Sequence, residues 1–176
     1  RKQLGLPQNV PIILFVANDY AKKGLDTLLS SSELLTDVHL AVVGSRNPQV
    51  EFVGKVNRLG LQDRVHFLGP LNDVNPAYQS ANLLVHPTLE DTFAMVVLEA
   101  MANRLPVLVS GPKFCGISAQ LVHEKNAILL NDPRNSQELL NRMVDLLKSS
   151  EGNHMLKNLS EHGLAFAALQ KELRSA

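Results

Sequence analysis

The chain has 176 residues, of which 45% are hydrophobic and 19% are charged, a composition typical of one globular domain with a buried core. Its 17 basic residues balance 17 acidic residues, so the formal net charge is zero, and neither bulk nucleic-acid binding nor attraction to an acidic membrane is expected. The single cysteine excludes an internal disulfide, and the apolar runs are too short to span a bilayer. We therefore expect no nucleic-acid partner and at most peripheral contact with a membrane.

Short apolar runs rich in β-branched residues alternate along the chain with longer segments of helical periodicity. Strands without polar alternation are buried on both faces, as in a parallel sheet covered by helices. Repeated strand–helix units of this kind predict an α/β fold with a doubly wound, parallel, Rossmann-like sheet. In chain order we expect strands at 11–17, 38–44, 65–68, 81–86, 106–110 and 127–130, and helices at 22–35, 48–59, 72–79, 92–103, 117–123 and from 135 onward with a break near 151–152.

The loop after the first expected strand carries two adjacent lysines. Doubly wound sheets bind ligands beyond the carboxyl ends of their strands, which is where this loop lies. Lys22, Lys23 and Gly24 stand where a helix is expected to begin. Positive charge opposes the helix dipole at that position, so a bound anion would account for the lysines. Two solvated lysine side chains explain the pattern equally well.

The loop after the fourth expected strand, and the helix that follows it, hold two carboxylates. Asp91 and Glu99 would lie about 12 Å apart along a helix that rises ~1.5 Å per residue, too far to share a proton or a metal ion. With Asp91 or Thr92 as the cap, the first N–H groups of the helix would bind an anion, and the two acids would flank an elongated polyol. Glu99 stands among apolar residues, so we expect it to be partly buried. A capping acid and an unrelated acid paired with an arginine remain the alternative.

The segment from His86 to Ser110, HPTLEDTFAMVVLEAMANRLPVLVS, resembles the E-x7-E signature of the retaining glycosyltransferases of family 4, PS-x-x-EGFG-x-x-x-LEAMA-x-G-x-P-V. The loop at Lys22–Gly24 is similar to the basic-Lys-Gly segment of that family, and the run Leu59–Gly69 is similar to its lead-in to the nucleotide-base loop. The match runs in the same order over most of the chain. The lysine pair, together with Cys115–Gly116, is most similar to the lipopolysaccharide core glucosyltransferases.

The resemblance implies the C-terminal, donor-binding half of a GT-B glycosyltransferase that transfers a hexose, with retention, from a nucleoside-diphosphate sugar to a saccharide or glycolipid acceptor such as lipopolysaccharide. The donor expected first is UDP-glucose or another UDP-hexose, with GDP-mannose as the alternative. No cofactor or metal ion is expected, in keeping with the lack of an Asp-x-Asp motif in the sequence.

The domain organisation that the resemblance implies is incomplete. Residues 1–176 would form a single domain, and the opening segment, RKQLGLP, reads like a connector entered from a preceding domain. The acceptor would bind through an N-terminal domain outside this chain, so the isolated domain would be inactive alone. A cytoplasmic location is expected, with contact at the inner face of a membrane as the alternative.

The roles of the family carry over by position. Lys22 and Lys23 would bind the donor diphosphate, Asp91 would bind hydroxyls of the donor sugar, and Glu99 would bind the ribose hydroxyls; these four are the expected catalytic residues. Backbone N–H groups of residues 92–95 would face the phosphates, and residues 69–71 would line the base. The expected donor-binding residues are Gly24, Gly69, Pro70, Leu71, Glu90, Thr92, Phe93, Ala94 and Met95.

The chain departs from the family pattern inside the signature itself. Asp91 is shorter than the usual glutamate, which leaves Glu90 as the alternative first acid. Thr92 and Ala94 replace both glycines of EGFG, and Asn18 replaces an arginine that often precedes the family lysine. Because glycine lets a backbone approach a ligand closely, Ala94 is expected to weaken donor binding or to select among donors.

Two alternatives to a transferase stay open: a sugar-nucleotide epimerase of the same fold and a non-catalytic nucleotide-sugar-binding domain. A nicotinamide-dependent dehydrogenase is excluded, because the first turn reads ANDYAKKG and lacks the glycine-rich fingerprint. Near the site, His86 is a candidate contact for sugar or phosphate. Cys115 is expected to be a packing residue rather than a nucleophile, since the sequence offers it no activating partner.

Overall fold

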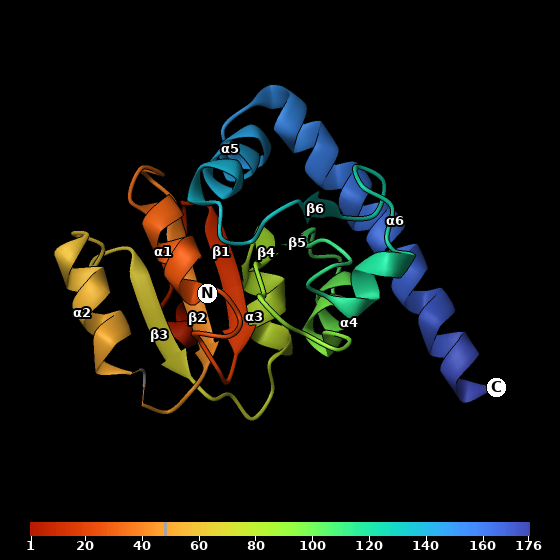
Figure 1. Ribbon diagram of the computed structural model, residues 1–176, viewed down its shortest axis with the longest axis horizontal. Helices are drawn as coiled ribbons and strands as arrows, with labels where there is room; N and C mark the ends of the chain where they lie inside the picture. Colours follow the sequence, from red (N-terminus) through yellow and green to blue (C-terminus); the bar gives the residue numbers. More distant parts are fainter. Residues whose placement is uncertain (48) are drawn as a thin grey trace.

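The computed structural model describes residues 1–47 and 49–176, which form a six-stranded parallel sheet between two layers of helices (Figure 1). The strand order is β3-β2-β1-β4-β5-β6, so the predicted doubly wound sheet is confirmed. The strands are β1 (Ile12–Ala17), β2 (His39–Gly44), β3 (Val65–Gly69), β4 (Leu83–His86), β5 (Val107–Ser110) and β6 (Ile128–Leu130).

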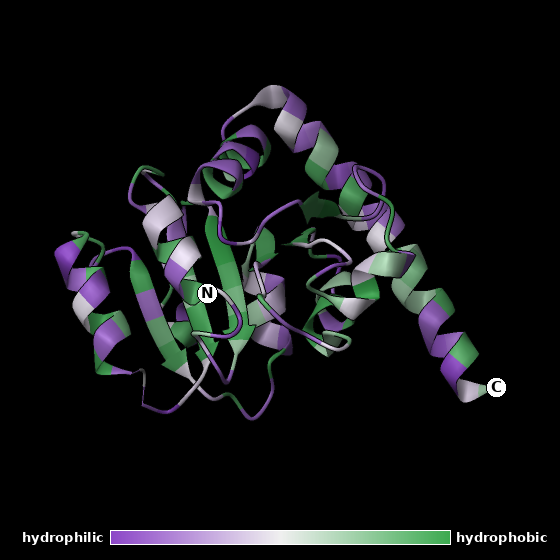
Figure 2. Cartoon of the chain, viewed as in Figure 1, coloured by the Kyte–Doolittle hydropathy of each residue, from purple (hydrophilic) through white to green (hydrophobic). Residues whose placement is uncertain are grey.

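Each face of the sheet has its own apolar core. Successive side chains of a strand point to opposite faces, so Ile13 and Phe15 of β1 enter one core while Ile12 and Leu14 enter the other. Figure 2 shows the central strands coloured hydrophobic along most of their length, whereas the helices carry both colours. The helices are α1 (Leu25–Ser32), α2 (Val50–Arg58), α3 (Asn75–Ser80), α4 (Met95–Ala102), α5 (Ser136–Leu147) and α6 (Ser150–Ser175), with short 3₁₀ helices η1 (Lys2–Leu4) and η2 (Gly116–Gln120).

The sheet changes winding direction between β1 and β4, which pair with each other at its centre. The loops that follow these strands lie side by side: the Leu89 N–H donates to the Lys22 carbonyl at 2.9 Å. Gly24 has a φ of 86°, and a Cβ added to it would lie 1.9 Å from the Pro87 carbonyl oxygen. Glycine is therefore required at position 24 by the contact between the two loops.

Two helices at this end of the sheet begin later than predicted. α1 begins at Leu25 rather than at Lys22, because the preceding turn ends at Gly24, so the two lysines lie before the helix. α4 begins at Met95 rather than at Thr92, because Ala94 takes a left-handed conformation with a φ of 69°. The prediction that Asp91 or Thr92 caps this helix is therefore wrong.

The predicted helical segment from residue 135 onward is divided at a different position. α5 ends at Leu147, and the Ser149 hydroxyl accepts a hydrogen bond from the Gly152 N–H at 2.9 Å as the cap of α6. The predicted break near residues 151–152 is therefore present but lies slightly earlier, at residues 148–149, and residues 151 and 152 belong to α6. The predicted helix at 48–59 begins at Val50 in the structure, and residue 48 lies outside the described residues.

α6 packs against both α5 and α4, and its final turns extend past α4 to the C-terminus (Figure 1). Over residues 1–47 and 49–176, no helix combines the length and the apolar character needed to cross a membrane.

Replacing Gly24 by alanine should lower the free energy of unfolding much more than the same change at Gly60. Both glycines have left-handed φ values, 86° and 66°, but a Cβ at Gly60 meets nothing within 4 Å. Gly60→Ala should therefore cost only the backbone term of about 1–2 kcal/mol. Gly24→Ala should cost at least about 2 kcal/mol more, because Pro87 must move. Urea unfolding of both variants measures the difference, and equal losses would contradict the loop contact.

Candidate active site

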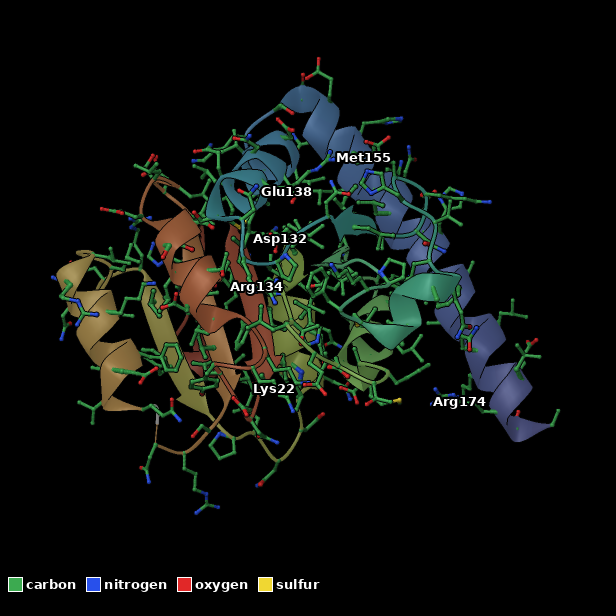
Figure 3. All side chains as sticks on the ribbon, viewed as in Figure 1. Lys22, Asp132, Arg134, Glu138, Met155 and Arg174 are labelled. Carbon is green, nitrogen blue, oxygen red and sulfur yellow. The ribbon has the colours of Figure 1, made fainter. Side chains whose placement is uncertain are left out.

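The candidate site is a depression of about 330 Å³ at the carboxyl end of the sheet, lined by the loops that follow β1, β2 and β4. Figure 3 shows Lys22 at this edge of the sheet. Lys23 and Asp91 both line the depression, so the structure brings together these two predicted site residues. Its other lining residues include Asn18, Asp19, Gly44, His86, Ala94, Met95 and Val96.

The Asp91 carboxylate is held by three donors. The Lys23 ammonium lies 3.1 Å from Oδ2, and the His86 ring nitrogen Nε2 lies 3.0 Å from the same oxygen. The other oxygen, Oδ1, accepts the backbone N–H of Phe93 at 3.2 Å. Lys23 also donates to the Glu90 carbonyl oxygen at 2.9 Å, which fixes the ammonium over this loop.

These contacts keep Asp91 ionised. The hydrogen bond from His86, together with the hydrogen bond and the charge of Lys23, holds the pKa of the Asp91 carboxyl well below its usual range, although partial burial acts in the opposite direction. An ionised carboxylate only accepts hydrogen bonds, so Asp91 is suited to bind hydroxyl groups of a ligand.

The structure separates the roles of the two adjacent acids in the signature. Asp91 lines the depression, whereas the Glu90 side chain is 76% exposed and lies 3.7 Å from the Lys22 ammonium. Exposed ion pairs of this kind contribute about 0–1 kcal/mol, so Lys22 can leave Glu90 for another anion at little cost. Of the two adjacent acids, Asp91 is thus the one that lines the depression.

The loop after β5 is fastened to the loop that carries Asp91. The Asp91 N–H donates to the Phe114 carbonyl at 3.0 Å, and the Gly116 N–H donates to the Asp91 carbonyl at 2.9 Å. A Cβ on Gly116 would lie 1.9 Å from the Thr92 carbonyl oxygen. Cys115 is buried between these contacts, and burial raises the pKa of its thiol, in keeping with the packing role predicted for it.

Glu99 lies on an exposed part of α4, so the prediction of a partly buried carboxylate is wrong. Its Oε2 accepts a hydrogen bond of 2.7 Å from the Tyr78 hydroxyl, a contact that the sequence did not predict. Burial, followed by this hydrogen bond and the charge of Glu99, raises the pKa of Tyr78 far above its ordinary value. The phenol therefore keeps its proton and orients the carboxylate. In the sequence, the only indication of this partner was a tyrosine in the short helix expected before the fourth strand.

Glu99 and Lys23 do not line one depression, although both are expected to contact the same donor. Glu99 lines a second one, of about 360 Å³, between α4 and α6. The two depressions adjoin at Met95, which lines both. Met95, at the start of α4, therefore lies between the part of the site that holds Lys23 and the part that holds Glu99.

The start of α4 offers fewer free donors than predicted. The Phe93 N–H is engaged by Asp91, and the Val97 N–H donates to the Ala94 carbonyl at 3.0 Å. Met95 and Val96, the first two residues of the helix, line the depression. Their N–H groups are in the position where a helix N-terminus attracts an anion.

The remaining predicted residues are placed outside these depressions. Gly24 faces Pro87 instead of the depression. Gly69 ends β3, two strands away from β1, and Pro70 and Leu71 follow it; these three residues line neither depression. They stay predicted base contacts.

The last turns of α6 cover the loop before α4, a contact that the sequence did not predict. The Arg174 guanidinium lies 4.6 Å from the centre of the Phe93 ring, and its Nη1 lies 3.2 Å from the Met95 sulfur. Figure 3 shows Arg174 near the C-terminal end of α6. In the described part of the chain, no group of three or more His, Cys, Asp or Glu side chains is placed to hold a metal ion.

A doubly wound sheet that brings a lysine, a fixed carboxylate and the start of a helix together at its switch point is a Rossmann-like α/β domain, and such sheets bind their ligands at this position. The chain belongs to the family of glycosyl transferases group 1, whose sequence pattern matches residues 1–163. The lipopolysaccharide glucosyltransferase WaaG of Escherichia coli is 30% identical over 149 residues, which cover 82% of this chain and 39% of WaaG. The predicted family resemblance is thereby confirmed, and the chain spans about two fifths of the length of this curated relative.

Solved glycosyltransferase structures share the fold. The crystal structure of WaaG superposes with a TM-score of 0.83 at 25% identity, over 96% of this chain and 45% of WaaG. Anabaena HepE in complex with UDP-glucose gives a TM-score of 0.85 at 25% identity, over 96% of this chain and 46% of HepE. The C-terminal domain of the group 1 protein LpcC from Francisella tularensis matches in fold, with a TM-score of 0.78 at 19% identity, over 97% of this chain and 90% of that domain. The predicted GT-B type of sheet is confirmed.

Ionised Asp91 should stabilise the domain at neutral pH, and this stabilisation should be lost at low pH. Because the folded-state pKa of its carboxyl lies below the unfolded value, its contribution is fully present above the unfolded pKa and is lost as the pH falls through the folded pKa. Between pH 6 and about pH 2.5, the free energy of unfolding of Asp91→Asn should therefore fall by roughly 1–2 kcal/mol less than that of the wild type. Urea unfolding across this range measures both slopes, and identical slopes would show that the carboxyl is not held as described.

Proposed function

We propose that the chain is the donor-binding domain of a retaining hexosyltransferase that uses a UDP-hexose, with UDP-glucose as the first candidate. The observation that carries this proposal is the placement of Lys23, Asp91 and His86 in one depression at the switch point of a group 1 glycosyltransferase fold. HepE was crystallised in complex with UDP-glucose, and WaaG is named a glucosyltransferase; both relatives support this choice of donor.

The donor diphosphate would bind the lysines. Lys23 would exchange its contact with Asp91 for a phosphate oxygen, and Lys22 would leave its weak, exposed pair with Glu90 for the same group. The N–H groups of Met95 and Val96 would add partial positive charge at the start of α4. These groups would stabilise the negative charge that develops on the leaving nucleotide, so that the reaction would need no metal ion or other cofactor.

The two acids would bind the two ends of the donor. Asp91, ionised and fixed, would accept hydrogen bonds from hydroxyls of the hexose. Glu99, oriented by Tyr78, would accept them from the ribose, with the donor passing over Met95 between the two depressions. The loop at residues 69–71 would then line the base.

The acceptor would bind through a second domain. The chain spans 39% of WaaG, and it matches 90% of the solved C-terminal domain of LpcC. We therefore place the acceptor, a saccharide or glycolipid, on an N-terminal domain that precedes residue 1 in the whole protein. The isolated chain should bind the donor without transferring the sugar. One buried, unpaired cysteine fits a reducing compartment, so we place the reaction in the cytoplasm.

Lys23→Ala should abolish binding of UDP and UDP-glucose to this chain, because Lys23, unlike Lys22, lines the depression in which the diphosphate would bind. Isothermal titration calorimetry of both ligands measures the effect. Cys115→Ser is the control: the residue is buried behind the loop, and its variant should bind as the wild type does. Unchanged affinity in Lys23→Ala would overturn the diphosphate assignment.

Glu99→Gln should weaken the binding of the ribose and leave the binding of the diphosphate unchanged. Replacing the carboxylate that would bind the ribose should weaken UDP binding by roughly tenfold, the effect of losing one or two hydrogen bonds to a charged group. Binding of inorganic pyrophosphate should be unchanged in Glu99→Gln and lost in Lys23→Ala. Competition against UDP-glucose measures both affinities, and a loss of pyrophosphate binding in Glu99→Gln would contradict the ribose role.

A further inference from the structure

We propose that His86 is a positioning residue that sets the selectivity of this site for the donor sugar by orienting the Asp91 carboxylate. The inference rests on the proposed function, since it requires Asp91 to contact the hexose. His86 ends β4, the strand whose loop carries Asp91, and its side chain is only 2% exposed. The contact of Nε2 with Asp91 Oδ2, at 3.0 Å, is therefore made from the rigid interior of the sheet.

Burial of the His86 imidazole lowers the stability of the domain. His86 Nδ1 is buried, and among the described residues it has no hydrogen-bond partner. A buried polar atom without a partner lowers the stability of the folded state. The three residues before it in β4 are Leu83, Leu84 and Val85, all fully buried, so an apolar side chain would suit this position better. An imidazole that opposes stability there indicates a functional contact, and the contact it makes is with Asp91.

The need for His86 follows from the movement expected of Lys23. In the structure, both groups contact Asp91 Oδ2. When the Lys23 ammonium turns to the diphosphate, the carboxylate keeps two donors: His86 on Oδ2 and the Phe93 N–H on Oδ1. These two donors fix the plane of the carboxylate. Its remaining lone pairs then point in fixed directions, so hydroxyls of the sugar are accepted only at matching positions.

The test compares the affinities of UDP and UDP-glucose, because only the second ligand carries the hexose. His86→Met fills the apolar strand position and removes the donor, whereas His86→Gln keeps an amide N–H near the position of Nε2. The wild type, both variants and Asp91→Asn are titrated with each ligand by calorimetry. His154→Met, at an exposed position on α6, is the matched control.

In His86→Met, the ratio of the two dissociation constants should shift at least about tenfold against UDP-glucose, with the UDP affinity close to wild type. His86→Gln should restore much of the ratio. His86→Met should have no further effect in the Asp91→Asn background, because both changes remove the same oriented carboxylate.

Three results would overturn the inference while the proposed function stands: an unchanged ratio in His86→Met, equal losses for both ligands, or additive effects with Asp91→Asn. If the wild-type chain binds neither UDP nor UDP-glucose, the proposed function itself fails. The two failures are therefore distinguished within one set of titrations.

Discussion

The pairing of β1 with β4 at the centre of the sheet is the constraint on which the site depends. The chain winds in opposite directions on either side of this pair, so the loops that follow the two strands leave the sheet edge apart from each other. They come back into contact at Gly24 and Pro87, where a side chain on residue 24 would not fit. That contact sets the distance between Lys23, on one loop, and Asp91, on the other.

At this edge of the sheet, each of the two lysines forms an ion pair with an acidic side chain of the β4 loop. Each lysine has a carboxylate within 4 Å, which offsets the cost of two ammonium groups side by side. The Lys22 pair is exposed and weak, and Asp91 has His86 as a second partner. Under the proposed function, both lysines would therefore move to the donor diphosphate without leaving a buried acid unpartnered. The two ion pairs together carry no net charge. An anion that replaced the two carboxylates would nevertheless contact two ammonium groups.

The sequence predicted the sheet, its strands in chain order and the loops at its carboxyl edge, because buried parallel strands are continuous apolar runs. It also predicted that Lys23 and Asp91 would contribute to one site, and the structure places both at one depression. It did not predict where α4 begins, since Ala94 precedes the helix in a left-handed conformation that alanine rarely adopts. The contacts of Glu99 with Tyr78 and of Phe93 with Arg174 join segments far apart in the chain, so no local pattern marks them.

Under the proposed function, the attachment of the β5 loop to the β4 loop has a consequence for how the donor preference of this site can change. Two backbone hydrogen bonds and the tight approach of Gly116 to Thr92 make residues 91–92 and 114–116 a single mechanical unit. Substituting one loop from a relative would leave the other with a mismatched shape. Exchange of donor specificity, in evolution or by engineering, should therefore proceed by transplanting both segments together, and chimaeras that split them should accumulate misfolded protein.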